Sequence, residues 1–540
     1  MFIKNYNNFK NIQEIVEFNT KTPIAEFLHP DEMPYIHGLE EAVQILVQNA
    51  NRQVTIVGDY DADGICATAI MYWGLRAYGI YPQTRLPHRF SEGYGLSEKI
   101  IDEIPEGVVI TVDNGIAAHK AIKKAKEKGL IVIVTDHHLA TRDSENNRIL
   151  PDADVVVDPN AEDVTQYKEY CGAGIAFRFV QELLKDKNIN LDDLLVMASI
   201  ATVCDVMKLV GANRILVKKG LEAINLGKGL PGLRMILTQM NLTDHITEED
   251  YGYRIGPTIN AAGRLIDDGS EQALKLFMMG KENPYLESSA KHLLELNEVR
   301  KKKVKDWMPI VDRLSHGMRP VVVYHPEIEE GIIGILAAEL TEKYQCPTIV
   351  FTKMKNGNLK GSGRSINCIH LKNVLDKIQE HILGYGGHEG AAGLLISSGS
   401  MNSFKDAFNK AVGTLPEIQE ENRYDLDLLM KSNNLETIMN DLKLFAPFGN
   451  GNPKPILRLK FSVTNYKRIG DGKSFMMPGK SMSLMGFNLV EKYENMGNPS
   501  TINCIGELQE SWYKGNCYYQ FLVKNFEDAK KIIQSLKEKP

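Results

Sequence analysis

Residues 54–64 read VTIVGDYDADG, and this stretch decides how the rest of the chain is interpreted. Its first four residues are apolar and mostly β-branched, a pattern typical of a buried strand. Three acidic residues follow at alternate positions, Asp59, Asp61 and Asp63, and then a glycine. Carboxylates this close repel one another unless a cation lies among them, and Mg²⁺ and Mn²⁺ prefer oxygen ligands. The stretch therefore predicts a divalent-metal site at the end of a strand.

Short apolar strands alternate with helices around this stretch. We expect helices at residues 65–78 and 117–128, between strands at residues 54–57, 82–86, 108–112, 130–134 and 155–157. Continuously apolar strands that alternate with helices favour a parallel sheet covered on both faces. In such sheets ligands bind outside the C-terminal ends of the strands. The fold class predicted for this part is therefore α/β.

Changes in pattern along the chain predict five segments. The first is a partly helical lead-in, and the second is the α/β domain with the acidic stretch. A long helical connector and a second α/β domain follow, and alternation of apolar and polar residues near residue 460 predicts a small antiparallel barrel of OB type at the end. The expected boundaries are 1–45, 46–215, 216–315, 316–415 and 416–540.

The composition is that of a globular protein. The 540 residues are 43% apolar and 24% charged, and the net charge of −6 argues against a binder coated in positive charge. The seven cysteines form no CxxC pair, which argues against a zinc knuckle. The N-terminus lacks the pattern of a signal peptide, and no apolar run reaches the ~20 residues of a membrane span. We therefore expect a cytoplasmic protein without membrane contact.

Further acidic and imidazole side chains follow other strands of the expected sheet. Asp113 comes directly after the strand at 108–112, residues 136–138 read DHH after the next strand, and Asp205 lies in the sequence TVCD. A single Asp after a strand is an ordinary cap or turn residue, whereas three such strand ends in succession indicate a shared site. Histidines beside several carboxylates fit two divalent cations that clamp a phosphate and activate water.

These motifs, in this order, resemble those of the DHH phosphoesterase superfamily. The matching segments are GDYDADG (58–64), VDNG (112–115), DHH (136–138) and CDV (204–206), with SGRS (362–365) and GGHEGAAG (386–393) similar to its associated second domain. Within the superfamily the chain is most similar to the RecJ family of single-strand-specific exonucleases. That similarity rests on the PHR (87–89) and GYG (93–95) loops, the segment RIGPTINAAGR (254–264) and the C-terminal domain.

The resemblance implies a site for two ions of Mn²⁺ or Mg²⁺. By that resemblance Asp61 binds one ion, Asp63 binds the other, and Asp113 bridges both. His137 and Asp205 are expected to complete the ligands of the second ion.

Three further residues of the site are implied in the same way. His138 is expected to face the scissile phosphate, and Asp136 to orient the histidines. The wider superfamily has a histidine four residues before the first motif aspartate, but this chain has Val57 there. Asp59 is the nearest residue that could take the place of this histidine, either as a metal ligand or as a base that contacts a metal ligand.

The resemblance also implies an activity. It predicts hydrolysis of single-stranded DNA from its 5′ end to 5′ mononucleotides, in DNA repair and recombination. Such polarity requires residues that hold the 5′ end, and guanidinium groups bind phosphate oxygens in bidentate geometry. The candidates are Arg89, Arg264, Ser362, Arg364, Gly387 and His388.

Two alternatives remain open from the sequence. One is a DHH phosphodiesterase acting on short oligonucleotides or cyclic dinucleotides, although such relatives generally stop after the GGH domain. The other is a non-catalytic DNA-binding replication scaffold, although such proteins lose carboxylates that this chain keeps. The expected partners are single-stranded DNA, a RecQ-type helicase and a single-strand-binding protein, and a monomer suffices for the expected site.

Overall fold

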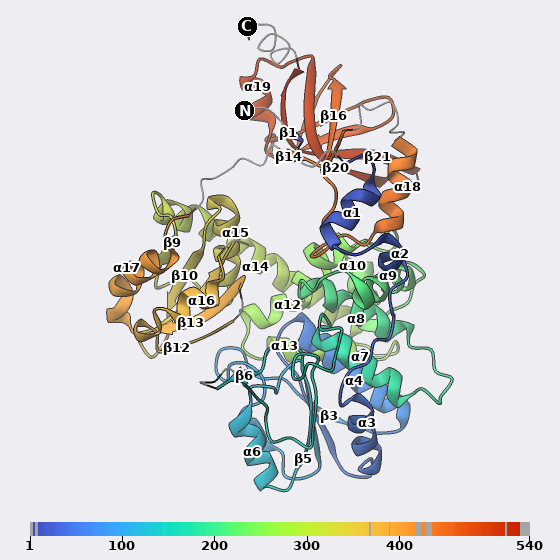
Figure 1. Cartoon of the computed structure of the whole chain (residues 1–540), viewed down its shortest axis with the longest axis vertical. Helices are drawn as coiled ribbons and strands as arrows, with labels where there is room; N and C mark the ends of the chain where they lie inside the picture. Colours follow the sequence, from blue (N-terminus) through green and yellow to red (C-terminus); the bar gives the residue numbers. More distant parts are fainter. Residues whose placement is uncertain are drawn as a thin grey trace.

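A five-stranded parallel sheet forms the lower part of the molecule in Figure 1. The strand order across the sheet is β3 (Gln83–Arg85), β2 (Val54–Val57), β4 (Val108–Val112), β5 (Ile131–Thr135) and β8 (Val155–Val157). All four pairings are parallel, as expected for apolar strands that alternate with helices. The computed structural model describes residues 4–5, 9–143, 145, 147–366, 369–387, 389–415, 423–427, 435–513 and 516–529.

Helices cover both faces of this sheet. Val109, Val132 and Val134 pack on one side, where α5 (Glu98–Glu103) and α6 (His119–Glu127) lie. Side chains of the opposite face pack against α4 (Ala62–Tyr78) and α7 (Gly172–Leu183), with α3 (Leu39–Gln48) beside α7. Helix α4 begins three residues earlier than expected, because the Asp61 side chain caps it by accepting hydrogen bonds from the Asp63 and Gly64 amides. A small hairpin, β6 (Thr141–Arg142) and β7 (Arg148–Ile149), follows β5.

A bundle of helices shares the hydrophobic core on the α4 and α7 side of the sheet. Its members are α8 (Asp192–Cys204), α9 (Gly211–Asn225), α10 (Pro231–Gln239), α11 (Glu248–Asp250), the π-helical turn η1 (Tyr251–Ile255), α12 (Gly256–Leu265) and α13 (Gly269–Met278). Sheet and bundle together are called the catalytic body below.

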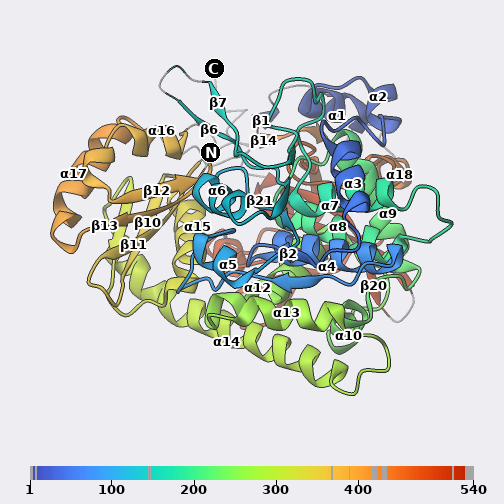
Figure 2. The same ribbon diagram turned by 90° about the horizontal axis from the view of Figure 1, so that it is seen from below.

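The expected connector, residues 216–315, ends in the long helix α14 (Leu286–Ser315), which runs along the lower edge of the view in Figure 2. In the first half of α14, Leu286, Ala290 and Leu293 belong to the core of the catalytic body. In its second half Val304 and Val311 belong to the core of the next domain. One continuous helix therefore contributes to two cores.

The second α/β domain has a mixed sheet. Its strand order is β12 (Gly384–Gly387), β13 (Ala391–Ile396), β11 (Leu359–Arg364), β10 (Thr348–Lys353) and β9 (Val321–Tyr324). Strands β9 and β10 pair in parallel, and the other pairs of this sheet are antiparallel. The helical elements are η2 (Glu330–Ile332), α15 (Ile333–Tyr344), α16 (Leu371–Asp376), η3 (Gln379–His381), η4 (Ser398–Ser400) and α17 (Met401–Val412). The glycine-rich stretch after residue 383 supplies its outer strands.

The C-terminal domain contains a seven-stranded sheet and the helices α18 (Leu435–Phe445) and α19 (Val490–Asn495). The strand order is β15 (Leu426–Asp427), β16 (Leu457–Ser462), β20 (Thr501–Tyr513), β21 (Asn516–Asp528), β19 (Ser483–Gly486), β18 (Ser474–Met477) and β17 (Lys467–Ile469). Most pairs of this sheet are antiparallel, as expected, but β15–β16 and β19–β21 pair in parallel, so the expectation of antiparallel pairing does not hold for these two. Between β19 and β21 the chain passes through α19 and β20, which provides the length that a parallel crossover needs.

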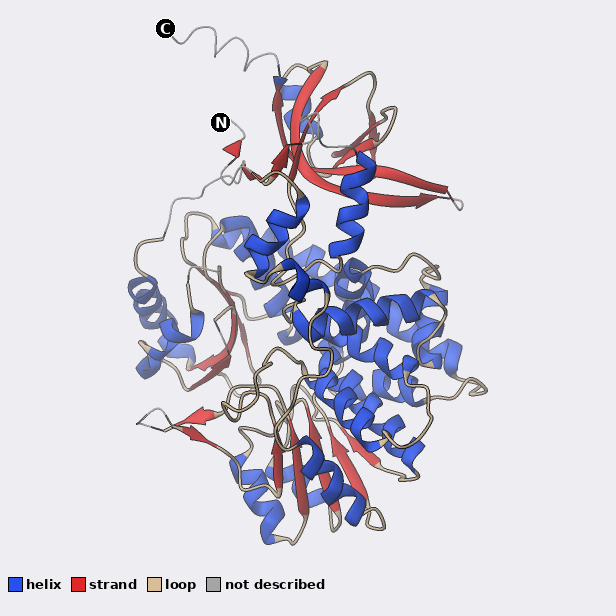
Figure 3. Ribbon diagram, turned by 45° about the vertical axis from the view of Figure 1, so that its right-hand side comes forward, coloured by secondary structure: helices blue, strands red, loops and turns tan. Residues whose placement is uncertain are grey.

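The N-terminal helices pack against this distant domain. Ile12, Ile15 and Val16 of α1 (Ile12–Thr20) and Phe27 of α2 (Ile24–Leu28) share its hydrophobic core. Strand β1 (Lys4–Asn5) pairs with β14 (Arg423–Tyr424). Figure 1 shows α1 and α2 beside α18, between the C-terminal sheet and the catalytic body, and Figure 3 shows the C-terminal sheet above a region of helices. No helix among the described residues is long and apolar enough to cross a membrane.

Candidate active site

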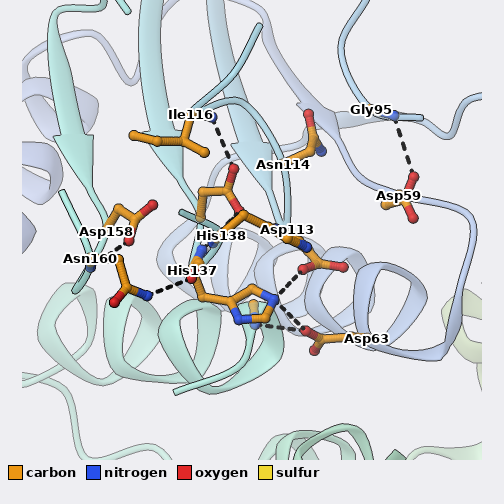
Figure 4. A network of polar contacts seen from close by, with 12 residues as sticks. Asp59, Asp63, Gly95, Asp113, Asn114, Ile116, His137, His138, Asp158 and Asn160 are labelled. Carbon is orange, nitrogen blue, oxygen red and sulfur yellow. Dashed lines mark hydrogen bonds and ion pairs between the residues drawn. The ribbon is translucent and has the colours of Figure 1, made fainter. Parts of the chain in front are cut away.

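The acidic side chains singled out in the sequence meet at the C-terminal edge of the parallel sheet. Asp59 and Asp61 follow β2, Asp113 follows β4, and the DHH triplet follows β5 (Figure 4). Asp63 lies in the first turn of α4. Asp205 does not follow a strand of the sheet: it comes directly after the last residue of helix α8.

Three groups of side chains offer ligand atoms that lie within 4.8 Å of one another. Asp63, His137 and Asp205 form one group, and Asp59, Asp61 and Asp113 form a second. The third group, Asp113, His137 and His138, shares a residue with each of the other two. The first two groups adjoin, because His137 Nε2 lies 3.1 Å from Asp113 Oδ1, 3.6 Å from Asp205 Oδ2 and 3.7 Å from Asp63 Oδ2. Asp113 thus lies between these two groups, where a bridging ligand is expected.

The electrostatics of these carboxylates fit a bound cation. Asp59 is 1% exposed and Asp113 is 2% exposed, and neither Asp59 Oδ2 nor Asp113 Oδ1 accepts a hydrogen bond from the described residues. Burial, reinforced by the neighbouring carboxylates, raises the pKa of Asp59, Asp113 and Asp205 well above the usual value. Buried carboxylates without compensation are costly, and a hard divalent cation supplies the missing charge. The residues present therefore fit Mn²⁺ or Mg²⁺.

The start of α7 fixes one of these carboxylates, a contact that the sequence analysis missed. The Gly172 amide donates to Asp63 Oδ2 at 2.7 Å, and the Ala173 amide donates to Asp63 Oδ1 at 2.8 Å. Free amides at a helix N-terminus bind anions well. Gly172 is also needed for close approach, since a Cβ atom there would lie 2.4 Å from the Asp113 Cβ. The signal in the sequence, a Cys-Gly-Ala-Gly helix start, is too general to reveal this contact.

Asp136 organises the two histidines. Its Oδ1 accepts a hydrogen bond from the His137 amide and lies 2.8 Å from His138 Nδ1, while its Oδ2 accepts one from the Ile116 amide. Burial lowers the pKa of His137 to about 4, so this side chain is neutral and available as a ligand. Burial opposes protonation of His138 as well, but Asp136 outweighs it and raises the pKa of His138 to about 10. His138 is therefore positively charged at neutral pH.

A loop after β8 supports the DHH triplet and was also missed. Asp158 directly follows β8, and its Oδ1 accepts a hydrogen bond from the Asn160 amide at 2.7 Å. Asn160 Nδ2 donates to the His137 carbonyl at 2.6 Å, as Figure 4 shows. The signal was present, because Asp158 ends an apolar strand as Asp113 does. On the opposite side Tyr94 Oη donates to the Asp113 carbonyl at 2.6 Å.

The predicted phosphate-binding arginines come from three segments and lie close enough for their charges to act on one another. Arg89 lies over the Tyr60 ring at 4.4 Å, Arg264 Nη1 donates to the Gly331 carbonyl, and Arg364 Nη1 donates to Ser362 Oγ. None of these arginines forms an ion pair with a carboxylate of the described residues. Burial, together with the charges of the neighbouring arginines, lowers the pKa of Arg264 to about 9. Burial and Arg89 lower the pKa of Arg364. Arg89, Arg264 and Arg364 are called the arginine cluster below. Since no carboxylate of the described residues pairs with them, the cluster is suited to bind an anion such as phosphate.

The remaining substrate candidates differ in position. Ser362 lies beside the start of α15, because a Cβ atom at Gly334 would lie 3.0 Å from Ser362 Oγ. Gly387 has a φ of 142°, and a Cβ atom there would lie 2.3 Å from the Ala391 carbonyl oxygen. The close approach that Gly387 permits is therefore to its own hairpin, and a role in substrate binding stays a prediction. His388 lies outside the described residues.

Known proteins match all three domains that contain a sheet. The DHH family N-terminal domain matches residues 53–202, the DHHA1 domain matches residues 317–414 and the RecJ OB domain matches residues 424–525. The single-stranded-DNA-specific exonuclease RecJ of Salmonella typhimurium is 34% identical over 473 residues, covering 81% of this chain and 80% of the relative. The chain belongs to the RecJ family.

Other members of the RecJ family agree. The Escherichia coli RecJ exonuclease is 32% identical over 535 residues, covering 91% of this chain and 90% of its own. The crystal structure of RecJ from Thermus thermophilus in complex with Mn²⁺ covers 95% of this chain with a TM-score of 0.80 and 26% identity, and 75% of that chain is covered. The corresponding structure with Mg²⁺ has a TM-score of 0.73 and 25% identity. The expected family and fold class are confirmed, and the acidic and histidine groups are positioned for metal binding.

Proposed function

We propose that this RecJ-family chain is a metal-dependent exonuclease that hydrolyses single-stranded DNA from the 5′ end to 5′ mononucleotides, in DNA repair and recombination. One observation carries the proposal: two adjoining groups of buried metal-ligating side chains lie in the same site as an arginine cluster without acidic partners. The relatives named single-stranded-DNA-specific exonuclease support the choice of substrate.

In this proposal each of two ligand groups holds one ion of Mn²⁺ or Mg²⁺. Asp59, Asp61 and Asp113 hold one ion, and Asp63, His137 and Asp205 hold the other. Asp113 would contribute to both positions, since its Oδ1 also lies 3.1 Å from His137 Nε2. Asp59 is a ligand in this scheme, because its Oδ2 has no hydrogen-bond partner among the described residues. When bound, the ions activate water and neutralise charge on the phosphate and the leaving 3′ oxygen.

His138 stabilises the phosphate during the reaction. Its pKa of about 10 keeps the imidazole protonated at neutral pH, so it can donate to a phosphate oxygen. Asp136 holds His138 in place through the 2.8 Å contact to Nδ1, and Tyr94 Oη lies 3.4 Å from Nε2, the nitrogen that would donate to the phosphate. Asp136 is a positioning residue in this account.

The arginine cluster sets the polarity of the exonuclease. A terminal 5′ phosphate carries more charge than an internal one, and the cluster of Arg89, Arg264 and Arg364 with Ser362 offers guanidinium and hydroxyl donors without competing carboxylates. An end held there would lie close to the metal ligands, because Arg89 stacks 4.4 Å from the ring of Tyr60, the residue between Asp59 and Asp61. Hydrolysis then releases one nucleotide at a time.

The wider setting is also a proposal. We propose a cytoplasmic monomer with domain boundaries at 1–45, 46–215, 216–315, 316–415 and 416–540, working with a RecQ-type helicase and a single-strand-binding protein. The family matches at 53–202, 317–414 and 424–525 fall within three of these segments, which supports the division. A single chain supplies every group of the site, which supports a monomer.

Digestion of single strands labelled at the 5′ or the 3′ end tests the activity. With Mn²⁺ or Mg²⁺ we expect labelled mononucleotide to leave first from the 5′-labelled strand. Asp113→Ala should abolish release, whereas Asp186→Ala, which removes an exposed carboxylate elsewhere, should not. Release from the 3′ end first, or an active Asp113→Ala variant, would contradict the proposal.

A further inference from the structure

A groove of about 480 Å³ lies between the catalytic body and the C-terminal domain. Val206 and Met207 after α8 and Tyr253 of η1 line one wall. Phe448 and Asn450, from the loop before β16, line the other. Its volume lies within the range of about 300–1,000 Å³ found for small-molecule sites.

This groove lies beside one of the candidate metal ligands. Asp205 lies 3.6 Å from His137 Nε2, and the residues on either side of it in the chain, Cys204 and Val206, both line the groove. The groove also reaches Lys454 and Glu507 of the C-terminal domain. A DNA strand that occupies the metal centre and also contacts the C-terminal domain would therefore pass close to this groove.

Backbone strain is concentrated at the groove wall. Val206 has a φ of 57°, which is rare for a β-branched residue, and its side chain is 66% exposed. The Asn450 side chain holds this conformation by donating to the Val206 carbonyl at 2.7 Å. Strained residues of this kind cluster at active sites and ligand clamps.

The π-helical turn η1 is a second irregularity at the same wall. The Gly256 amide donates to the Tyr251 carbonyl, and Cys204 fills the space beside this turn, since a Cβ atom at Gly256 would lie 2.3 Å from Cys204 Sγ. Such turns are often found at functional sites. Tyr251 is buried against Ser199, whereas Tyr253 is 81% exposed. No aromatic or cationic side chain among the described residues stacks on the Tyr253 ring.

The charges of the groove favour a base over a phosphate. Lys454 pairs with Glu249 at 3.1 Å and with Glu507 at 3.8 Å, and Lys524 also pairs with Glu507. Glu248 accepts a hydrogen bond from the Phe448 amide. The cations are thus engaged, which leaves apolar and aromatic surface rather than free positive charge. Base stacking on aromatic side chains is the sequence-independent contact of single-strand binders.

We propose that Tyr253, with Val206 and Met207, binds a base of single-stranded DNA on the 3′ side of the scissile phosphate. Tyr253 stacks on the base, and the two apolar side chains cover its edge. This inference rests on the proposed exonuclease function. It explains how the enzyme keeps hold of the shortened DNA strand between rounds of hydrolysis.

Strands carrying the fluorescent base 2-aminopurine at single positions test this contact in the Asp113→Ala background, where cleavage is blocked. We expect quenching at one or two positions just 3′ of the first phosphodiester. Adding Tyr253→Ala should remove that quenching and weaken binding about tenfold, whereas Tyr253→Phe should retain both. The matched control is Tyr285→Ala, which removes a tyrosine that is 68% exposed at the start of α14, and it should leave both unchanged.

Steady-state kinetics separate the inference from the proposed function. In the otherwise wild-type enzyme Tyr253→Ala should raise KM for long strands about tenfold with a much smaller change in kcat. Quenching and KM that are unaffected by Tyr253→Ala overturn this inference alone. A wild-type enzyme that neither binds nor degrades single strands overturns both.

Discussion

The C-terminal domain and the DHHA1 domain flank the same catalytic body but are attached to it in different ways. Several polar contacts and a stacked ring pair hold the C-terminal domain. The DHHA1 domain is attached through one long helix and a close backbone contact. The difference suggests that one domain fixes the path of the strand, while the other completes the site that receives its end.

The contacts of the C-terminal domain centre on a buried arginine. Arg214 of α9 is 1% exposed, and its Nη2 donates to the Leu444 carbonyl at 2.8 Å and to the Ala446 carbonyl at 3.1 Å. Its guanidinium also lies 4.5 Å from the Phe27 ring, so α9 holds the N-terminal helices and the end of α18 together. At a second point Trp512 of β20 stacks on His245 of the catalytic body, with ring centroids 3.7 Å apart.

The DHHA1 domain approaches the catalytic body around Arg264. Arg264 Nη1 donates to the Gly331 carbonyl at 3.2 Å, and a Cβ atom at Gly331 would lie 1.7 Å from the Arg264 carbonyl oxygen. Helix α14 joins the DHHA1 domain partly through Trp307, which donates to Glu329 at 3.0 Å. The contact between the DHHA1 domain and the catalytic body therefore includes Arg264, a member of the arginine cluster.

The largest effect on stability is expected at the C-terminal attachment. Arg214→Met should leave two carbonyls without donors and destabilise the docking of α18 by about 3 kcal/mol, since each unsatisfied buried group costs about 1–3 kcal/mol. Hydrogen exchange across residues 435–462 measures this loss. The control Lys218→Met, on the exposed side of the same helix, should change little. Equal exchange in the two variants would show that Arg214 does not hold the domain.

A smaller effect, on activity, is expected at the DHHA1 side. Arg364→Ala should lower kcat/KM on 5′-phosphorylated strands about tenfold to a hundredfold, because a hydrogen bond to a charged group contributes about 1.5–3 kcal/mol. The loss should be weaker on strands with a 5′ hydroxyl. Arg313→Ala removes an exposed arginine of α14 and serves as the control. An equal loss on both kinds of strand would argue against recognition of the 5′ phosphate.

The smallest effect is expected in the loop that carries Arg89. Glu92 accepts hydrogen bonds from Arg85 and Lys99. Burial by itself would raise the pKa of the Glu92 carboxyl, but these hydrogen bonds outweigh burial and lower that pKa to about 2. Because the folded-state pKa lies below the unfolded value, the stabilisation is present above about pH 4.5 and is lost as the pH falls towards 2.

Denaturant unfolding of the wild type and Glu92→Gln checks this dependence on pH. The wild type should be more stable at pH 7 by about 1–2 kcal/mol, and the difference should narrow below about pH 4.5 and disappear only as the pH falls through about 2. A difference that does not depend on pH would mean that the charge of Glu92 contributes nothing.

Local patterns made the catalytic sheet and its acidic edge predictable. Runs such as VTIV at 54–57 bury both faces, so they identify strands without reference to the rest of the chain. Asp61, Asp113 and the DHH triplet follow such runs directly, and parallel topology then brings them together.

Contacts between distant segments could not be predicted in the same way. The apolar stripe of α1 shows that the helix packs, but not that its partner is α18. The parallel pairs of the C-terminal sheet depend on tertiary crossovers, and the π-helical turn at Tyr251 depends on the Cys204 side chain beside it. The Asn160 side chain donates to a backbone carbonyl, that of His137, so its residue type alone did not mark it.

Counting the bound manganese tests most directly the claim that Asp113 joins two ion positions. Titration of the wild-type chain with Mn²⁺, followed by the electron paramagnetic resonance signal of the free ion, should give two ions per chain. Asp113→Ala should weaken both positions together, because each loses a ligand, while Asp186→Ala should bind as the wild type does. A single ion in the wild type, or two ions of unchanged affinity in Asp113→Ala, would contradict the account.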